Sequence, residues 1–214
     1  MTQLMAERMT KRLVIIGAGG HGKVAADCAE SMAVYDDIVF LDAGFSERPQ
    51  VGPWKIIGLP EDFNQYTDCE FFVAIGDNHG RQRWLLQLLA AQVSIASLVH
   101  SSAVVSKHSS FGEGSLICAN AVVNPFTSLG FGCILNTGAT IDHDCNVGDM
   151  VHIAPGSHVA GGVNIGELCF IGVGSSIIPS LSIGQNSTLG AGSVVITDIA
   201  ENSLAYGIPA KVVN

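Results

Sequence analysis

The sequence repeats every six residues over its C-terminal half. From residue 99 to residue 195 every sixth position carries an aliphatic residue, apart from a single Phe, with no insertion or deletion. The fifth position of each hexad is small or aliphatic, and Cys133, Cys145 and Cys169 fall on it. The fourth position is rich in Gly and Asn, the residues that adopt the positive φ of a tight turn at least cost.

A hexad of this kind predicts one short strand and one corner. Three hexads close a triangular coil of about 18 residues, and stacked coils bury a column of aliphatic side chains. We therefore expect residues 98–214 to form an all-β left-handed parallel β-helix with a C-terminal extension. Most known proteins with this repeat are acyltransferases, and a β-solenoid without an enzymatic role is the alternative.

The composition excludes several classes of partner. Only 14% of the residues are charged, against about a quarter in most soluble proteins, which suggests that identical subunits cover part of the surface. The net charge of -9 argues against nucleic acid and anionic membranes as partners. No apolar run approaches the roughly 18–20 residues that span a bilayer.

The cysteines and the N-terminus point to the cytoplasm. The six cysteines have no metal-like spacing, so we expect no metal and interpret them as reduced, small buried side chains. Residues 1–10 are polar and lack the apolar segment of a signal peptide.

Residues 1–97 predict an α/β Rossmann-like half domain. Residues 17–22 read Gly-Ala-Gly-Gly-His-Gly between a strand and a helix, a context in which the backbone can approach a phosphate at the helix N-terminus. Asp42 ends the next strand, where a carboxylate can bind a ribose hydroxyl. The expected elements are strands at 12–16, 38–41 and 71–75 and helices at 23–32 and 81–91, with residues 95–98 leading into the solenoid.

The size of this domain limits its ligand. About 95 residues make roughly half of a dinucleotide-binding fold, so a mononucleotide that carries another group fits better than NAD. A glycine-rich turn with no ligand is the alternative.

His143 is the strongest candidate for chemistry on the solenoid. It is the third residue of its hexad, at an outward corner, and Asp144 follows it. The same corner one coil later is Gly161, and stacked coils lie about 4.8 Å apart. The imidazole therefore lies beside a residue without a side chain, which leaves room for a thioester and offers an N–H to its carbonyl oxygen. Histidine suits a general base, and a neighbouring carboxylate fixes its tautomer.

The other histidines lack this arrangement. His152 comes half a coil after His143, on the far side of the same prism, so the two can share a site only across subunits. His100, His108 and His158 are interpreted as surface residues, and His79 is placed at the cleft of the first domain. For His143 itself, the alternative is a solvated side chain.

Five segments together resemble a known family. They are residues 17–22, Phe-Leu-Asp at 40–42, Ala-Ile-Gly-Asp-Asn at 74–78, Leu-Asn-Thr-Gly-Ala-Thr-Ile-Asp-His-Asp-Cys at 135–145, and Tyr-Gly-Ile-Pro-Ala-Lys at 206–211. They resemble the bacterial sugar acetyltransferases of the sialic-acid O-acetyltransferase type. This group includes N-acetyltransferases that act on nucleotide-linked 4-amino-4,6-dideoxy sugars such as bacillosamine precursors and perosamine.

The resemblance implies a homotrimer, with a nucleotide-sugar in the first domain and acetyl-CoA between adjacent prisms. It also implies a role for each matching residue. His143 is the implied general base, with Asp144 as its partner and Asn136 in support. The implied contacts to acetyl-CoA are His152, Gly161, Val173 and Ala191. The implied contacts to the nucleotide-sugar are Gly19, Gly20, His21, Asp42, Asp77 and Asn78.

The resemblance implies acetyl-CoA-dependent N-acetylation of the sugar 4-amino group by direct attack on the thioester. O-acetylation of a sugar hydroxyl, as in sialic acid, and a non-catalytic nucleotide-sugar-binding scaffold are the alternatives. Ala43 stands where some relatives that use a UDP-sugar have a second Asp, so both UDP and GDP stay open.

Overall fold

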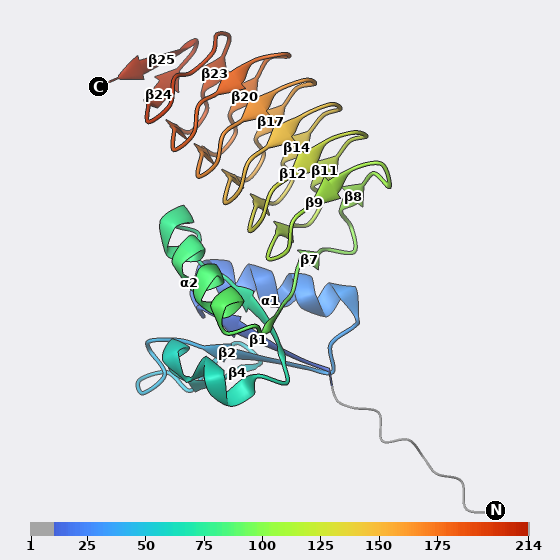
Figure 1. Cartoon of the computed structure of the whole chain (residues 1–214), viewed down its shortest axis with the longest axis vertical. Coiled ribbons are helices and arrows are strands. Elements are labelled where there is room, and N and C mark those ends of the chain that lie inside the picture. Colours follow the sequence, from blue (N-terminus) through green and yellow to red (C-terminus); the bar gives the residue numbers. More distant parts are fainter. Residues whose placement is uncertain (1–10, 214) are drawn as a thin grey trace, which may run out of the picture.

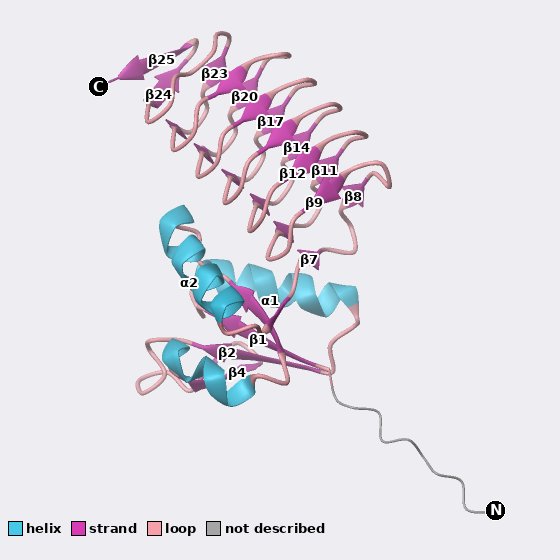
Figure 2. Cartoon of the chain, viewed as in Figure 1, coloured by secondary structure: helices cyan, strands magenta, loops and turns pink. Residues whose placement is uncertain are grey.

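The computed structural model describes residues 11–213. Residues 1–10, in which the sequence predicts no signal peptide, lie outside the described part. An α/β domain leads directly into a long prism (Figure 1). Within the described residues, the helices belong to the first domain and the prism consists of strands and turns (Figure 2). No helix in residues 11–213 is long and apolar enough to cross a membrane.

The first domain is a mostly parallel sheet between helices. In residues 11–213 its six strands run in the order β3-β4-β2-β1-β5-β6, and only β3 pairs antiparallel. The strands are β1 (Arg12–Ile16), β2 (Asp37–Leu41), β3 (Gln50–Val51), β4 (Trp54–Gly58), β5 (Glu70–Val73) and β6 (Ser94–Ile95), and the helices are α1 (Gly20–Met32), a 3-10 helix (Pro60–Tyr66) and α2 (Asn78–Ala90). The α/β domain and its three expected strands are confirmed.

Both long helices begin three residues earlier than the sequence predicted. Helix α1 starts inside the glycine motif at Gly20, since Gly22 packs so closely on the carbonyl of Gly17 that only a residue without a side chain fits. Helix α2 starts at Asn78 because the Asp77 carboxylate accepts the Gly80 N–H at 2.6 Å and caps the helix.

The prism is a left-handed parallel β-helix with three faces, as predicted. The first face contains β7 (Leu98–Val99), β10 (Leu116–Ile117), β13 (Ile134–Leu135), β16 (His152–Ile153), β19 (Phe170–Ile171) and β22 (Thr188–Leu189). The second face contains β8 (Val104–Val105), β11 (Val122–Val123), β14 (Thr140–Ile141), β17 (His158–Val159), β20 (Ser176–Ile177) and β23 (Val194–Val195). The third face contains β9 (Ser110–Phe111), β12 (Ser128–Leu129), β15 (Asn146–Val147), β18 (Asn164–Ile165) and β21 (Ser182–Ile183).

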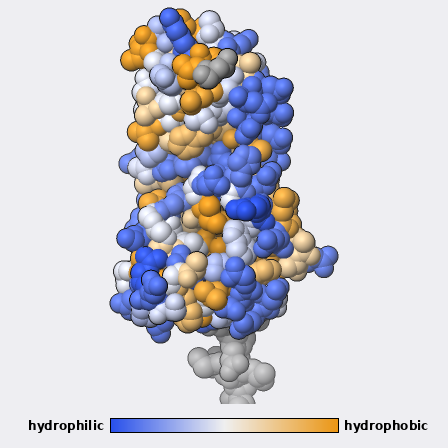
Figure 3. Space-filling view, turned by 90° about the vertical axis from the view of Figure 1, so that its left-hand side faces the viewer, coloured by the Kyte–Doolittle hydropathy of each residue, from blue (hydrophilic) through white to orange (hydrophobic). Residues whose placement is uncertain are grey.

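Two further strands close the C-terminal end of the prism. β24 (Leu204–Gly207) pairs parallel with β22 on the first face, and β25 (Ala210–Val213) returns antiparallel along β24. Leu204, Tyr206 and Ile208 are exposed here, and Figure 3 shows hydrophobic surface at this end of the molecule.

The corners follow the predicted rule for backbone conformation. We name each corner by the faces that it joins: 1–2, 2–3 and 3–1. From Gly114 to Gly192 every fourth-position residue has φ between +55° and +71°. The expected need for left-handed turns is thus confirmed, although not every residue that meets it is Gly or Asn.

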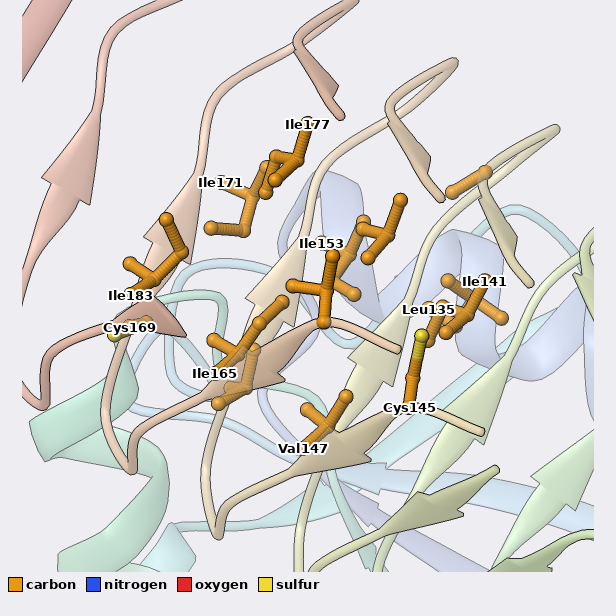
Figure 4. Close-up of a cluster of buried hydrophobic side chains, with 14 of the residues drawn as sticks. Leu135, Ile141, Cys145, Val147, Ile153, Ile165, Cys169, Ile171, Ile177 and Ile183 are labelled. Atoms are coloured by element: carbon orange, nitrogen blue, oxygen red, sulfur yellow. The ribbon is translucent and has the colours of Figure 1, made fainter. Parts of the chain in front are cut away.

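The prism core follows from the hexad. The second residue of each two-residue strand points inward, so the repeating aliphatics stack as three columns. Figure 4 labels several of them together with Cys145 and Cys169 of the fifth position. All six cysteines are free and buried. The fifth-position side chains do more than fill space, because their hydroxyl or thiol donates to the carbonyl 15 residues later, as in Cys145 to Ala160 (3.2 Å) and Ser157 to Gly172 (2.7 Å).

One buried cation joins the first domain to the prism. Arg81 on α2 is fully buried and donates to the carbonyls of Gly132 and Met150, both at 2.8 Å. Asn78 accepts from Arg81 at 2.8 Å and donates to the carbonyl of Leu168 at 2.9 Å. Gly132, Met150 and Leu168 are the fourth-position residues of three successive 3–1 corners, so the pair binds one carbonyl from each coil.

Arg81 is held by dipoles and not by a countercharge. No carboxylate in residues 11–213 lies within salt-bridge distance of it. Burial lowers the pKa of Arg81 to about 10, so the side chain is still charged at neutral pH. A buried charge without an ion-pair partner needs all of its hydrogen bonds, so this contact fixes how the two parts pack.

We predict that Arg81→Met destabilises the protein by at least about 3 kcal/mol, because several buried carbonyls lose their donor at once. Urea unfolding measures the effect. Arg83→Met on the exposed side of the same helix is the control and should change stability by less than about 0.5 kcal/mol. Equal stabilities of the two variants would contradict the assigned role of Arg81.

Candidate active site

His143 projects from the 2–3 corner between β14 and β15. Its side chain is 60% exposed, and its Nδ1 lies 2.8 Å from the Asp144 carboxylate. Asp144 has φ +58°, a left-handed conformation that Asp tolerates better than most residues. Because the carboxylate can only accept, Nδ1 carries the hydrogen and Nε2 is left as a free base.

Two neighbouring carboxylates set the pKa and the position of His143. The hydrogen bond to Asp144, followed by the charge of Asp142, raises the pKa of His143 above its ordinary value. Asp142 also accepts the His143 N–H at 2.8 Å, and Asn124 holds Asp142 at 2.9 Å. Backbone and side chain of His143 are therefore both fixed by acidic residues of the same corner.

Gly161 lies directly against the imidazole, as the coil spacing predicts. A Cβ at Gly161 would lie 2.6 Å from Cε1 of His143, a distance that no side chain can adopt. In the part of the chain that the structure describes, no acceptor takes the Gly161 N–H. The corner therefore presents a base and an unused backbone donor side by side.

His152 occupies a different environment, on the first face of the prism. Asn136 donates to its Nε2 at 3.1 Å, so Nδ1 carries the hydrogen and donates to the Gly76 carbonyl at 3.2 Å. Asn136 is therefore placed beside His152 and not beside His143 of the same chain. Burial, and then the charge of Arg81, lowers the pKa of His152 to about 4, so the ring is neutral at neutral pH.

His21 links the glycine motif to this face. Its ring centroid lies 6.1 Å from that of His152. Burial and the charge of Arg81 also lower its pKa to about 4. Its Nε2 is buried and has no hydrogen-bond partner among the described residues, which leaves this nitrogen available to a ligand.

The glycine motif and Asp42 lie together at the carboxyl edge of the sheet. Gly19 and Gly20 are exposed, and open space surrounds the position of a Cβ on each. Asp42 accepts the N–H of Ala18 at 2.7 Å and that of Gly44 at 2.9 Å. Burial alone would raise the pKa of Asp42, but these amides and Arg48 outweigh it and lower the pKa.

Asp77 and Asn78 differ in what they offer a ligand. Asp77 is exposed at the mouth of a groove of about 500 Å³ between the first domain and the first face of the prism. Asn78 was expected to contact the nucleotide-sugar, but its Oδ1 and both amide hydrogens are used by Arg81, Leu168 and Cys169. Its side chain is part of the domain contact, and a contact of Asn78 with the nucleotide-sugar stays a prediction.

The expected site residues fall into three groups around the prism. His143, Asp144 and Gly161 form the 2–3 corner. Gly19, Gly20, His21, Asp42 and Asp77 lie beside the first face, with Asn136 and His152. Val173 and Ala191 are exposed at the 1–2 corner. No group of three or more His, Cys, Asp or Glu residues within the described part of the chain is arranged to hold a metal ion.

Comparison with known proteins matches both parts of the chain. Residues 12–88 match the PglD N-terminal domain family. The acetyltransferase domain of PglB from Neisseria gonorrhoeae FA1090, solved with acetyl coenzyme A, superposes with a TM-score of 0.91 at 37% identity, over 95% of this chain and 100% of that one. The chain belongs to this family of sugar N-acetyltransferases.

Two further relatives support this placement. PerB from Caulobacter crescentus, solved with CoA and GDP-perosamine, has a TM-score of 0.87 at 37% identity, over 94% of this chain and 97% of that one. UDP-N-acetylbacillosamine N-acetyltransferase of Bacillus subtilis (strain 168) is 35% identical over 111 residues, 49% of this chain and 50% of that protein. The match therefore spans about half the length of this curated relative. The resemblance found in the sequence motifs is confirmed.

We predict that Asp144→Asn moves the acidic limb of the pH profile of kcat/KM to lower pH. The base must be neutral, and the variant loses the hydrogen bond that chiefly raises the pKa of His143. Initial rates from pH 5 to 9 measure the shift. Glu167→Gln removes one exposed charge at another corner and should leave the limb in place. If the acidic limb does not move in Asp144→Asn, Asp144 does not raise the pKa of the base.

Proposed function

We propose that this protein transfers the acetyl group of acetyl-CoA to the 4-amino group of a nucleotide-linked 4-amino-4,6-dideoxy sugar, with His143 as general base. The pair of His143 and Asp144 against Gly161 carries the proposal. PglB with acetyl coenzyme A and PerB with GDP-perosamine support the two substrate classes.

The geometry suits direct attack on the thioester. The sugar amine attacks the carbonyl carbon while Nε2 of His143 removes its proton, and Asp144 stabilises the imidazolium through Nδ1. The Gly161 N–H donates to the carbonyl oxygen as negative charge develops there. The carbon–sulfur bond then breaks, and the imidazolium returns the proton to the CoA thiolate.

The residues of the first domain suit the nucleotide-sugar, and those of the prism suit acetyl-CoA. The amides of Gly19 and Gly20 at the start of α1 suit the diphosphate, Asp42 and Asp77 suit hydroxyl groups, and the free Nε2 of His21 suits a polar atom of the acceptor. We assign the acetyl-CoA arm to His152, Gly161, Val173 and Ala191, of which Val173 and Ala191 lie on later coils than His143.

One chain cannot complete this site alone. The 2–3 corner with His143 is the vertex opposite the first face, against which the glycine motif lies. His152 follows His143 by half a coil, so both sides of the site have nearly the same height along the prism. Rotation about an axis parallel to the prism preserves that height, and a neighbour's His143 can therefore reach this chain's nucleotide loop.

We accordingly propose a cytoplasmic homotrimer in which each 2–3 corner meets the 1–2 corner of the next subunit. The second face joins these two corners and would turn toward the three-fold axis. Its outward side chains carry no formal charge: Val104, Val122, Thr140, His158, Ser176 and Val194. Uncharged faces suit close contact between subunits, and six free thiols suit a reducing compartment.

Release of free thiol from acetyl-CoA with a panel of UDP-, GDP- and CMP-linked amino sugars tests the reaction. We expect turnover with a 4-amino acceptor and a kcat lowered by roughly 10²–10⁴ in His143→Asn, the usual scale for general acid–base catalysis. Thermal stability should hardly change, because the side chain is exposed. Near-normal turnover in His143→Asn, or no turnover with any amino sugar, would contradict the proposal.

A further inference from the structure

Three corner residues break the rule that left-handed positions are small or polar. Most fourth-position residues are Gly, Asn, Asp or Ser, which adopt positive φ at little cost. The exceptions are Phe126 (φ +64°), Met150 (φ +58°) and Leu168 (φ +62°). A bulky side chain in this conformation needs a compensating interaction.

Two of the exceptions are explained by the contact between domains. Met150 is 2% exposed and packs with Leu85 of α2 in a buried cluster, against which Leu168 also packs. Their carbonyls accept from Arg81 and Asn78. Burial and hydrogen bonding offset the backbone cost at both positions.

Among the described residues Phe126 has no such compensation. Its side chain is 68% exposed, and its ring contact is a stack on His108, with centroids 5.8 Å apart and planes 30° apart. The buried clusters of the described residues do not include it. A strained backbone that presents an exposed aromatic ring indicates a function outside the folding of the single chain.

The position of Phe126 indicates which substrate its ring faces. It lies in the 2–3 corner one coil before Asp144, and the Asp144 N–H donates to the carbonyl of Pro125 at 3.2 Å. On the other side of His143 is Gly161, from which the proposed acetyl-CoA arm rises to later coils. The side toward Phe126 is therefore the one left for the acceptor.

We infer that Phe126 is a specificity-determining residue whose ring packs against the apolar side of the acceptor sugar beside His143. This inference rests on the proposed function. A 4,6-dideoxy sugar carries a methyl group at C6 in place of a hydroxymethyl group, so its C5–C6 edge is apolar. An aromatic face favours such an edge and penalises a hydroxyl that would lose its water there.

Phe126→Asn separates this role from folding, because Asn suits positive φ. We expect its melting temperature to be equal or higher, its KM for the dideoxy acceptor to rise about three- to tenfold, and its KM for acetyl-CoA to stay unchanged. The preference for the 6-deoxy acceptor over its 6-hydroxy analogue should shrink. Phe126→Tyr keeps the ring and should retain wild-type preference, and Leu86→Gln removes an exposed apolar side chain of α2 as a control.

The outcomes distinguish this inference from the proposed function. Active wild-type protein together with an unchanged acceptor KM in Phe126→Asn would overturn the inference alone. Dissociation of the assembly in that variant, seen by light scattering, would also overturn it and assign the ring to a subunit contact. Wild-type protein that releases no thiol with any amino sugar would overturn both.

Discussion

The stacking of residues 18 apart is the constraint on which the rest of this structure depends. Each coil hydrogen-bonds to the next through its short strands, so a residue pairs with the one 18 positions later without any shift of register. The chain contains no insertion that would break this register between residues 99 and 195. The period places Gly161 one coil after His143, so the base and its backbone donor are positioned by the same repeat that builds the core.

The same regularity made much of the molecule predictable from sequence. A period of six with a large and a small inward residue can close only as a three-faced coil, and the fourth position had to be left-handed. The outward His143, its Asp144 partner and the missing side chain at Gly161 follow from position in the hexad alone. Strand–glycine–helix order likewise predicted the half domain and the position of its glycine motif between a strand and a helix.

The sequence could not predict what depends on contact between the two parts. Arg81 follows Asp77 by four residues, but nothing in the sequence relates it to its partners on the prism, the carbonyls of Gly132 and Met150 more than 50 positions away. Asn78 was predicted to bind the ligand because it follows a strand next to Asp77. Its side-chain amide donates to the carbonyls of Leu168 and Cys169 on the prism. The placement of Asn136 against His152 was missed because it requires the stacking distance on the first face, where the first domain also supplies the Gly76 carbonyl. Phe126 gave no signal until its φ and exposure were known.

In the proposed trimer each site takes its base from one subunit and its nucleotide loop from the next. Trimers assembled from equal amounts of His143→Asn and Gly20→Val chains test it most directly, since a side chain at Gly20 meets open space and should not disturb folding. We expect the mixture to recover about a quarter of wild-type thiol release, because about one site in four then combines an intact base with an intact loop. Activity no higher than the sum of the two parent variants would show that each chain completes its own site.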